Sequence, residues 1–298
     1  MERVWELLPA ALRGRIDGLP QDLREHIEEV RLRLGRPLFV TLPEGELPLD
    51  GGAVDTEMIS FVLERASRCS VHTVLEQIRN GFVTVQGGHR LGLCGTGVVE
   101  KGNLVNLRAI SSMSLRQARE VKGVATGSLP RLFEGKRLRN TLILAPPGKG
   151  KTTLLRDLIR GISYGEGCPA LRVGLADERG EVAAVWEGRP MLDVGPHTDV
   201  MDGCPKSIGM MTLLRGMSPQ VLAVDEITHE EDAKALLQAV GCGVSLLATV
   251  HGESAADLRR RQVFRRLVQE GVFERFILID GVGRGRKYRV VEGVEKVC

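Results

Sequence analysis

The segment APPGKGKTT, residues 145–153, constrains the fold more than any other part of this chain. It lies between the apolar run TLIL and the run LLRDLIRGI, so a buried strand, a turn and a helix are expected in that order. Glycine at positions 148 and 150 lets the backbone turn tightly and point its N–H groups inward, where they can hold phosphate oxygens. The alternative is a glycine-rich turn that happens to precede a helix. Strand, loop, lysine, threonine and helix together favour a phosphate-binding loop.

The side chains of this loop predict a site for ATP and Mg²⁺. Lys151 is expected to reach the β- and γ-phosphates, and the Thr152 hydroxyl is expected to ligate the metal. The strict motif begins with glycine where this chain has Ala145, and alanine fits there only if its φ angle stays negative. The predicted nucleotide-binding residues are Ala145, Pro146, Pro147, Gly148, Lys149, Gly150, Lys151, Thr152 and Thr153.

A second apolar run, VLAV at residues 221–224, ends in two adjacent carboxylates. Asp225 is expected at the tip of a strand, where it would hold the metal and its water shell. Glu226 would then polarise the attacking water. An ordinary acidic turn after a strand is the alternative, but the phosphate-binding loop upstream favours the catalytic interpretation.

Two further strand ends carry polar side chains. The segment LADERGEV could order the water bound to the metal, and the alternative is a solvated turn with ion pairs. The segment SLLATVHG ends with Thr249 and His251, and His251 could sense the γ-phosphate or position the water, although a lone histidine is more often packed or solvated. The charged residues of the first segment are Asp177, Glu178, Arg179 and Glu181.

Arginines near these motifs are candidates because phosphoryl transfer needs positive charge at the γ-phosphate. Arg215 precedes the strand that ends in the two carboxylates. Arg108, Arg116 and Arg119 lie on the segment that leads toward the phosphate-binding loop. A solvated charge or surface ion pair is the alternative for each of them, and for Arg119 it is the better interpretation.

Two other polar segments are given weaker roles. GPHTDVMDGCPK, residues 195–206, contains residue types that can bind metal, but their spacing fits no zinc pattern, so we interpret it as a loop near the nucleotide. The basic run at residues 259–266 could contact nucleic acid or acidic lipid, yet a solvated helix face is the better interpretation.

The order of these runs predicts two domains. Residues 1–125 combine short strands, a helix pair over residues 55–81 and a glycine-rich β-meander over residues 81–110, which indicates a smaller α+β domain. In residues 126–298 buried strands alternate with helices, including one helix over residues 257–271 and a terminal hairpin with a basic turn. This alternation predicts an α/β fold, a RecA-like P-loop ATPase domain with a mostly parallel sheet, whose ligands lie at the carboxyl ends of its strands.

Composition limits the partners. Aromatic residues make up 4% of the chain and the formal net charge is +3, so nucleic acid is not the expected partner, although a nucleic-acid-stimulated P-loop ATPase remains the alternative function. No apolar run approaches the roughly 18 residues of a membrane span, and the N-terminus lacks an export signal. Scattered cysteines without a C-x-x-C pair predict reduced thiols. We therefore expect a soluble cytoplasmic protein that reaches a membrane only through partners.

The order of the motifs resembles a known family. The loop, DERGE, GPHTDVMDGCPK, LLRGMSPQVLAVDEI and ATVHGES, behind GGHRLGLCGTG and ISSMSLRQAREVKG, are together similar to the stage III sporulation protein AA family. The resemblance covers nearly the whole chain. That family belongs with the secretion-superfamily ATPases of type II and type IV systems.

The resemblance implies a hexameric ring with nucleotide bound between the two domains. Glu178 would take the acidic-box position, Glu226 the position of the catalytic glutamate and His251 the histidine-box position. Arg108 and Arg116 would be the arginines of the first domain that complete the site. Ala145 departs from the loop of that family, which puts nucleotide affinity in question.

The resemblance also implies a place and a role. It suggests the mother-cell cytoplasm of a spore-forming bacterium, with the ring docked on membrane-embedded channel proteins that join mother cell and forespore. Our hypothesis is an ATP-hydrolysing motor that energises or assembles this channel. A nucleotide-gated structural ring with little hydrolysis is a further alternative.

Overall fold

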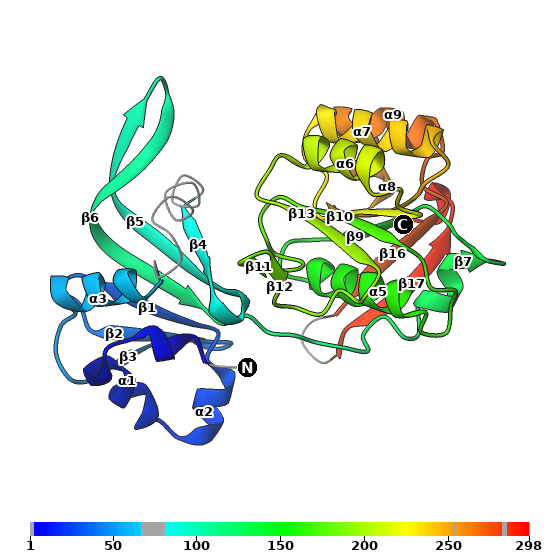
Figure 1. The fold of residues 1–298 in the computed structure, drawn as a ribbon. Helices are drawn as coiled ribbons and strands as arrows, with labels where there is room; N and C mark the ends of the chain where they lie inside the picture. Colours follow the sequence, from blue (N-terminus) through cyan, green and yellow to red (C-terminus); the bar gives the residue numbers. More distant parts are fainter. Residues whose placement is uncertain (1–2, 67–80, 253, 282–284, 298) are drawn as a thin grey trace. The chain divides into compact units, whose positions relative to one another are not determined.

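The computed structural model describes residues 3–66, 81–252, 254–281 and 285–297 (Figure 1). The chain forms two compact units, each with its own hydrophobic core. The first unit comprises Met1–Arg119 together with the excursion Ala184–Met191, and the second comprises Glu120–Ala183 and Leu192–Cys298. Within the described residues no helix is long and apolar enough to cross a membrane.

The first unit is built on an antiparallel sheet. Within the described residues six strands lie in the order β3-β2-β1-β6-β5-β4, and every neighbouring pair is antiparallel. The long strands β5 and β6 form a ribbon that projects beyond the other strands of this sheet (Figure 1). The strands are β1 (Glu29–Arg33), β2 (Leu38–Leu42), β3 (Gly45–Leu49), β4 (Phe82–Val85), β5 (His89–Glu100) and β6 (Asn103–Arg116).

Short helices supply the rest of the first core. Their buried residues, such as Leu12, Ile16 and Val62, pack with the inward-facing residues of the sheet. The helices are η1 (Val4–Leu7), α1 (Ala10–Asp17), α2 (Gln21–His26), α3 (Thr56–Ala66) and η2 (Gln86–Gly88). The excursion adds the two-residue strands β11 (Val185–Trp186) and β12 (Arg189–Pro190).

The second unit is built on a mostly parallel sheet. Within the described residues seven strands lie in the order β13-β10-β14-β15-β9-β16-β17, and only β17 runs antiparallel to its neighbour. Their central residues are almost all buried, as expected for a sheet that helices cover on both faces. The strands are β9 (Thr141–Ala145), β10 (Val173–Asp177), β13 (Thr198–Asp202), β14 (Val221–Val224), β15 (Ser245–His251), β16 (Arg275–Asp280) and β17 (Lys287–Glu292).

Helices cover the two faces of this sheet. One core cluster joins alternate strand residues, such as Leu144 and Val224, to α6, α7, α8 and α9, whereas α5 contacts β9, β10 and β15 from the other face. The helices are α5 (Lys151–Tyr164), α6 (Lys206–Gly216), α7 (Glu230–Gly241), α8 (Ala255–Arg260) and α9 (Gln262–Gln269). Smaller elements are η3 (Leu129–Leu132), β7 (Phe133–Glu134), β8 (Arg137–Leu138) and η5 (Val294–Lys296).

The predicted fold class is confirmed, and so are the meander and the terminal hairpin. Two local predictions were wrong. The helix expected over residues 257–271 is divided at Arg261, whose backbone is extended (φ −82°, ψ 122°). The loop expected over residues 195–206 contains β13, which pairs with β10 at the sheet edge. The second helix of the predicted pair lies mostly outside the described residues.

Candidate functional site

The carboxyl ends of four neighbouring parallel strands bring the predicted motifs together. Strand β15 lies between β9, which enters the phosphate-binding loop, and β14, which ends before the two carboxylates; β10 lies beside β14. Ligands of open parallel sheets bind at this edge. Residues far apart in the sequence therefore meet there because the strands are parallel.

The loop has the backbone conformation that its glycines predict. Gly148 has φ +73° and Gly150 has φ +90°, in the left-handed region that other residues rarely adopt. Ala145 is the last residue of β9 and lies in extended backbone, so the alanine is compatible with the loop. Gly150 caps α5, which presents its positive N-terminal end and free N–H groups toward the loop.

Lys151 lies at the centre of the loop. Its side chain is buried, and Nζ donates to the carbonyl oxygens of Ala145 at 2.8 Å and Pro146 at 2.9 Å and contacts His251 Nδ1 at 2.7 Å. Burial lowers the pKa of Lys151, while the charges of Asp225 and Glu226 oppose that shift. An incoming phosphate oxygen would have to replace one of these three acceptors.

The Asp225 carboxylate binds two hydroxyl groups. Thr152 donates to Oδ2 at 2.8 Å, and Thr249 donates to Oδ1 at 2.6 Å. Burial raises the pKa of Asp225, and the two hydroxyl bonds oppose the shift. One carboxylate beside one hydroxyl oxygen is a donor set that suits Mg²⁺, which takes few protein ligands and fills its shell with water and phosphate oxygens.

Glu226 has a strained backbone and a fixed side chain. Its φ is +50°, a conformation that costs a residue with a side chain about 1–3 kcal/mol. Its backbone N–H donates to Thr249 Oγ1 at 2.8 Å, and its Oε1 lies 3.0 Å from His251 Nε2. Both hold the carboxylate beside the loop, with about a third of its side chain exposed.

The contacts of His251 define its tautomer. An ammonium group can only donate, so Nδ1 accepts from Lys151 and carries no proton. The proton of the neutral ring is then on Nε2, which lies 3.0 Å from Glu226 Oε1. His251 thus joins the lysine of the loop to the carboxylate that faces it. The sequence predicted a role for His251 but not this bridge.

The acidic turn after β10 has a different construction. Asp177 is buried, and its carboxylate accepts from the backbone N–H groups of Glu181, Val182 and Ala183. Burial raises the pKa of Asp177 to about 6, although these N–H groups oppose the shift. The Arg156 guanidinium, from α5, donates to the carbonyl oxygens of Glu181 and Val182. Asp177 therefore shapes the turn, and its oxygens are not available to a metal.

Glu178, in the same turn, lies near the two carboxylates that follow β14. It lines a narrow cleft with Asp225 and Glu226, and its Oε2 lies 2.7 Å from Nζ of Lys206. Burial opposes ionisation, but the hydrogen bond and charge of Lys206 lower the pKa of Glu178. Lys206 is buried at the start of α6 and is the last residue of the segment predicted from the sequence to lie near the nucleotide, although its pairing with Glu178 was not predicted.

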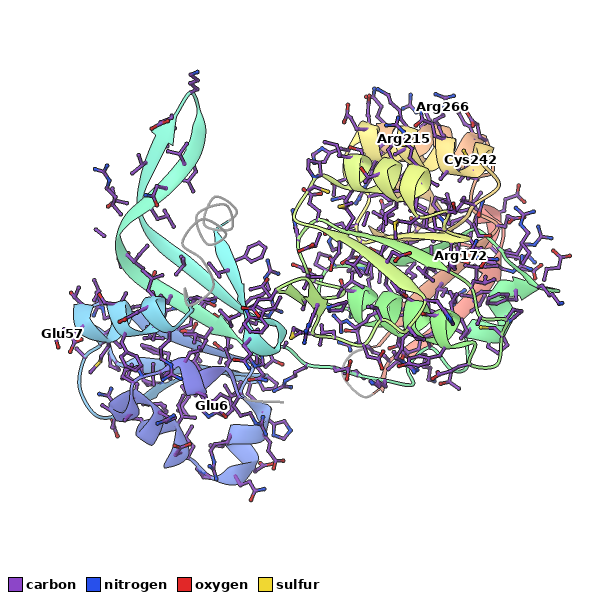
Figure 2. The ribbon with its side chains drawn as sticks, viewed as in Figure 1. Glu6, Glu57, Arg172, Arg215, Cys242 and Arg266 are labelled. Atoms are coloured by element: carbon purple, nitrogen blue, oxygen red, sulfur yellow. The ribbon has the colours of Figure 1, made fainter. Side chains whose placement is uncertain are left out.

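The predicted arginines are divided between the two units. Arg215 is exposed in the last turn of α6 (Figure 2), and Ser218 just beyond accepts from Arg172, which precedes β10. Arg215 therefore lies at the amino ends of the strands, at the opposite edge of the sheet from the phosphate-binding loop. Arg108 and Arg116 are exposed on β6 of the first unit.

The loop has one neighbour that the sequence did not indicate. Arg286, from the β16–β17 hairpin, donates to the carbonyl oxygen of Gly148 at 3.4 Å. Its guanidinium lies against Gly150, where an added Cβ would be 3.0 Å from Nη1. In the sequence, the only signal for Arg286 was the glycine-rich basic turn. The sequence does not show which loop this turn contacts, because that depends on the strand order.

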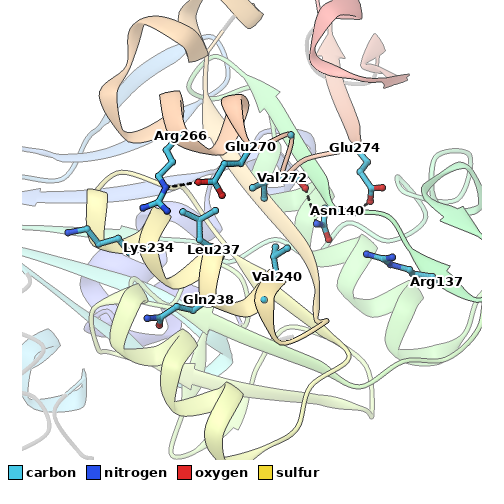
Figure 3. A pocket seen from close by; sticks show the side chains of 12 residues that line it. Arg137, Asn140, Lys234, Leu237, Gln238, Val240, Arg266, Glu270, Val272 and Glu274 are labelled. Carbon is cyan, nitrogen blue, oxygen red and sulfur yellow. Dashed lines mark hydrogen bonds and ion pairs between the residues drawn. The ribbon is translucent and has the colours of Figure 1, made fainter.

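A separate hollow of about 740 Å³ lies at the opposite edge of the sheet (Figure 3). It is lined by the last turns of α7 and α9 and by Asn140, which precedes β9. Arg266 pairs with Glu270 at 2.7 Å, and Asn140 donates to the carbonyl oxygen of Val272 at 2.9 Å. The hollow holds none of the predicted motifs, so we do not place the site there.

Comparison with known proteins matches nearly the whole chain to one family. The family model "Sporulation stage III, protein AA" matches residues 1–294. The stage III sporulation protein AA of Bacillus subtilis is 41% identical over 278 residues, which cover 93% of this chain and 90% of that protein.

Solved structures show the same fold at low sequence identity. The pilus retraction motor PilT, solved with bound ADP, matches with a TM-score of 0.61 at 16% identity, over 92% of this chain and 81% of that one. The ATPase DotB of Legionella pneumophila matches with a TM-score of 0.57 at 17% identity, over 89% of this chain and 76% of that one. These likenesses concern the fold.

Proposed function

The chain belongs to the sporulation stage III protein AA family, and from that premise we propose that it is an ATPase of the type II and type IV secretion kind. It binds Mg-ATP at the phosphate-binding loop and hydrolyses the γ-phosphate bond. One observation carries this proposal: Lys151, His251 and Glu226 form a continuous chain of contacts beside Asp225. The PilT structure contains ADP on the same fold, which supports nucleotide as the ligand.

Binding falls to the loop and the end of α5. Its backbone N–H groups and Lys151 hold the phosphates, and the free energy of this contact comes from charge-assisted hydrogen bonds at the positive end of a helix. Thr152 and Asp225 are the residues that would hold Mg²⁺, which supplies positive charge to the phosphate oxygens. To contact a phosphate oxygen, Lys151 must release one of its contacts with a carbonyl oxygen or with His251. Phosphate binding therefore rearranges the loop.

Hydrolysis falls to Glu226. A carboxylate accepts the proton of the attacking water only if it points at that water, and the contact with His251 Nε2 restrains the direction of the Glu226 carboxylate. Glu178, held by Lys206, faces the same cleft and orders the water.

The assembly and the cellular role extend this proposal. Secretion-type ATPases act as rings, so Arg108 and Arg116 complete the site in a hexamer, and Arg215 is left out of the site of its own chain. The ring works in the mother-cell cytoplasm and energises or assembles membrane-embedded channel proteins. Membership of the sporulation family supports this context.

Phosphate release from Mg-ATP, measured across protein concentration, tests the proposal. Wild-type protein should turn over ATP with a specific activity that rises with concentration, because a ring assembles the site, and Lys151→Ala should show no activity. Single-stranded DNA should change neither rate. Absence of turnover at every concentration would contradict hydrolysis, and activity driven by DNA would favour a nucleic-acid-stimulated ATPase.

A further inference from the structure

The side of the phosphate-binding loop that faces away from Glu226 carries positive charge. Strand β16 lies beside β9 on the side opposite β15, so the β16–β17 hairpin emerges next to the loop. From this hairpin come Gly281, whose carbonyl oxygen accepts from Lys149 at 3.4 Å, and Arg286. The hairpin therefore touches the loop at two points.

The Arg286 guanidinium is held against the loop by weak contacts. Its bond to the Gly148 carbonyl is long, at 3.4 Å, and the guanidinium lies across Gly150 at the start of α5. Its Nε is shielded from solvent and has no hydrogen-bond partner within the described part of the chain. A buried donor without a partner is unfavourable, so this group favours an acceptor that reaches it.

The charge at this position also favours an anion. The N-terminus of a helix carries partial positive charge, and Arg286 and Lys151 both lie there. The carboxylates of Asp225 and Glu226 are on the other side of the loop, beyond β15. A phosphate chain along the loop would compensate this excess of positive charge.

The strand order decides which phosphates are involved. Thr152, Asp225 and Glu226 place the γ-phosphate end toward β14 and β15, so the nucleoside end of the ligand leaves on the side of β16. Building on the proposed function, we propose that Arg286 binds the α- and β-phosphates of the nucleotide. Its planar fork of donors suits two phosphate oxygens at once, which lysine does not match.

The test is nucleotide affinity, measured by calorimetry with ATP and with ADP. Arg286→Gln should raise Kd for both nucleotides by about 10- to 100-fold, as expected for loss of charge-assisted bonds. Arg286→Lys should give a smaller rise, and in turnover assays KM should change more than kcat. The matched control is Arg289→Gln on the same hairpin, where Arg289 is half exposed and pairs with Asp280 at 3.8 Å; it should bind both nucleotides as wild type does.

Three results would overturn the assignment. Unchanged affinity of folded Arg286→Gln and Arg286→Lys for both nucleotides would remove Arg286 from the site. Weaker binding of ATP with unchanged binding of ADP would move Arg286 to the γ-phosphate. Wild-type protein that binds neither nucleotide would overturn the proposed function together with this assignment, whereas wild-type binding with unaffected variants would overturn the assignment alone.

Discussion

Two neighbouring strands of the second unit, β10 and β14, each end in an Asp-Glu pair, and the two pairs are built for different purposes. After β10, Asp177 accepts from three backbone N–H groups of its own turn. After β14, Asp225 accepts from two hydroxyl groups, one of them on the phosphate-binding loop. The first aspartate fixes a turn, and the second contacts the loop of the proposed nucleotide site.

The glutamates differ as well. Glu178 has ordinary backbone and an ion pair with Lys206, whereas Glu226 has φ +50° and contacts His251. Both Asp-Glu pairs follow buried strands of the same sheet, and they differ in the groups that contact them. Asp225 and Glu226 lie beside β15 and the loop, whereas the Asp177 carboxylate contacts the backbone of its own turn.

The largest expected effect is on catalytic activity, and it concerns the Asp-Glu pair that follows β14. Glu226→Gln keeps the size of the side chain but cannot accept a proton, so kcat should fall by about 100- to 10,000-fold while ATP binding remains. Glu231→Gln, which removes the same charge from an exposed residue at the start of α7, should leave kcat unchanged. Full turnover in Glu226→Gln would show that the general base has been assigned to the wrong residue.

The next effect separates the pairs by stability. Asp177→Ala leaves buried backbone N–H groups without an acceptor, which should lower the free energy of unfolding by about 3 kcal/mol at pH 5. Amide hydrogen exchange at residues 181–183 should accelerate in this variant. Asp280→Ala, at a side chain that is 60% exposed, should change neither quantity. If slow exchange at residues 181–183 survived in Asp177→Ala, the turn would be held by something else.

The smallest effect concerns pH. The pKa of Asp177 is about 6 in the folded protein, above its value of about 3.9 in an unfolded chain. A carboxyl group with a raised folded pKa stabilises the fold while it is protonated, so its contribution is complete below about pH 4 and is lost as pH rises through 6. Between pH 4 and pH 7 the wild type should lose about 2 kcal/mol of stability from this group.

Denaturant unfolding across this pH range measures the loss, with Asp177→Ala as the reference that lacks the group. The difference in stability between the two proteins should shrink as pH rises. A difference that stays constant from pH 4 to pH 7 would mean that Asp177 titrates normally.

The sequence alone predicted what is local or follows from parallel strands. The loop was predictable because its glycines, at φ +73° and +90°, occupy conformations that other residues rarely adopt. Asp225 and His251 could be expected at one edge because parallel strands end together. The domain boundary near residue 125 and the arginines of the first unit stay predictions.

What could not be predicted depends on tertiary packing. Asp177 and Asp225 both follow an apolar strand and precede glutamate, and the groups that donate to their carboxylates distinguish them. Strand β13 has the polar sequence TDVMD because it lies at the sheet edge, so it was interpreted as a loop. Arg215 lies at the end of α6, whose connection to β14 places it at the amino ends of the strands. Arg286 reaches the loop only through the pairing of β16 with β9.

The difference between the two aspartates is tested most directly by single-turnover phosphate formation from Mg-ATP, measured with enzyme in excess for Asp225→Asn and Asp177→Asn. The account predicts that Asp225→Asn slows the chemical step by about 100-fold or more, because the metal loses its carboxylate, while Asp177→Asn stays within about threefold of wild type per folded molecule. A slow Asp177→Asn beside a fast Asp225→Asn would contradict the assignment of the reaction to the end of β14.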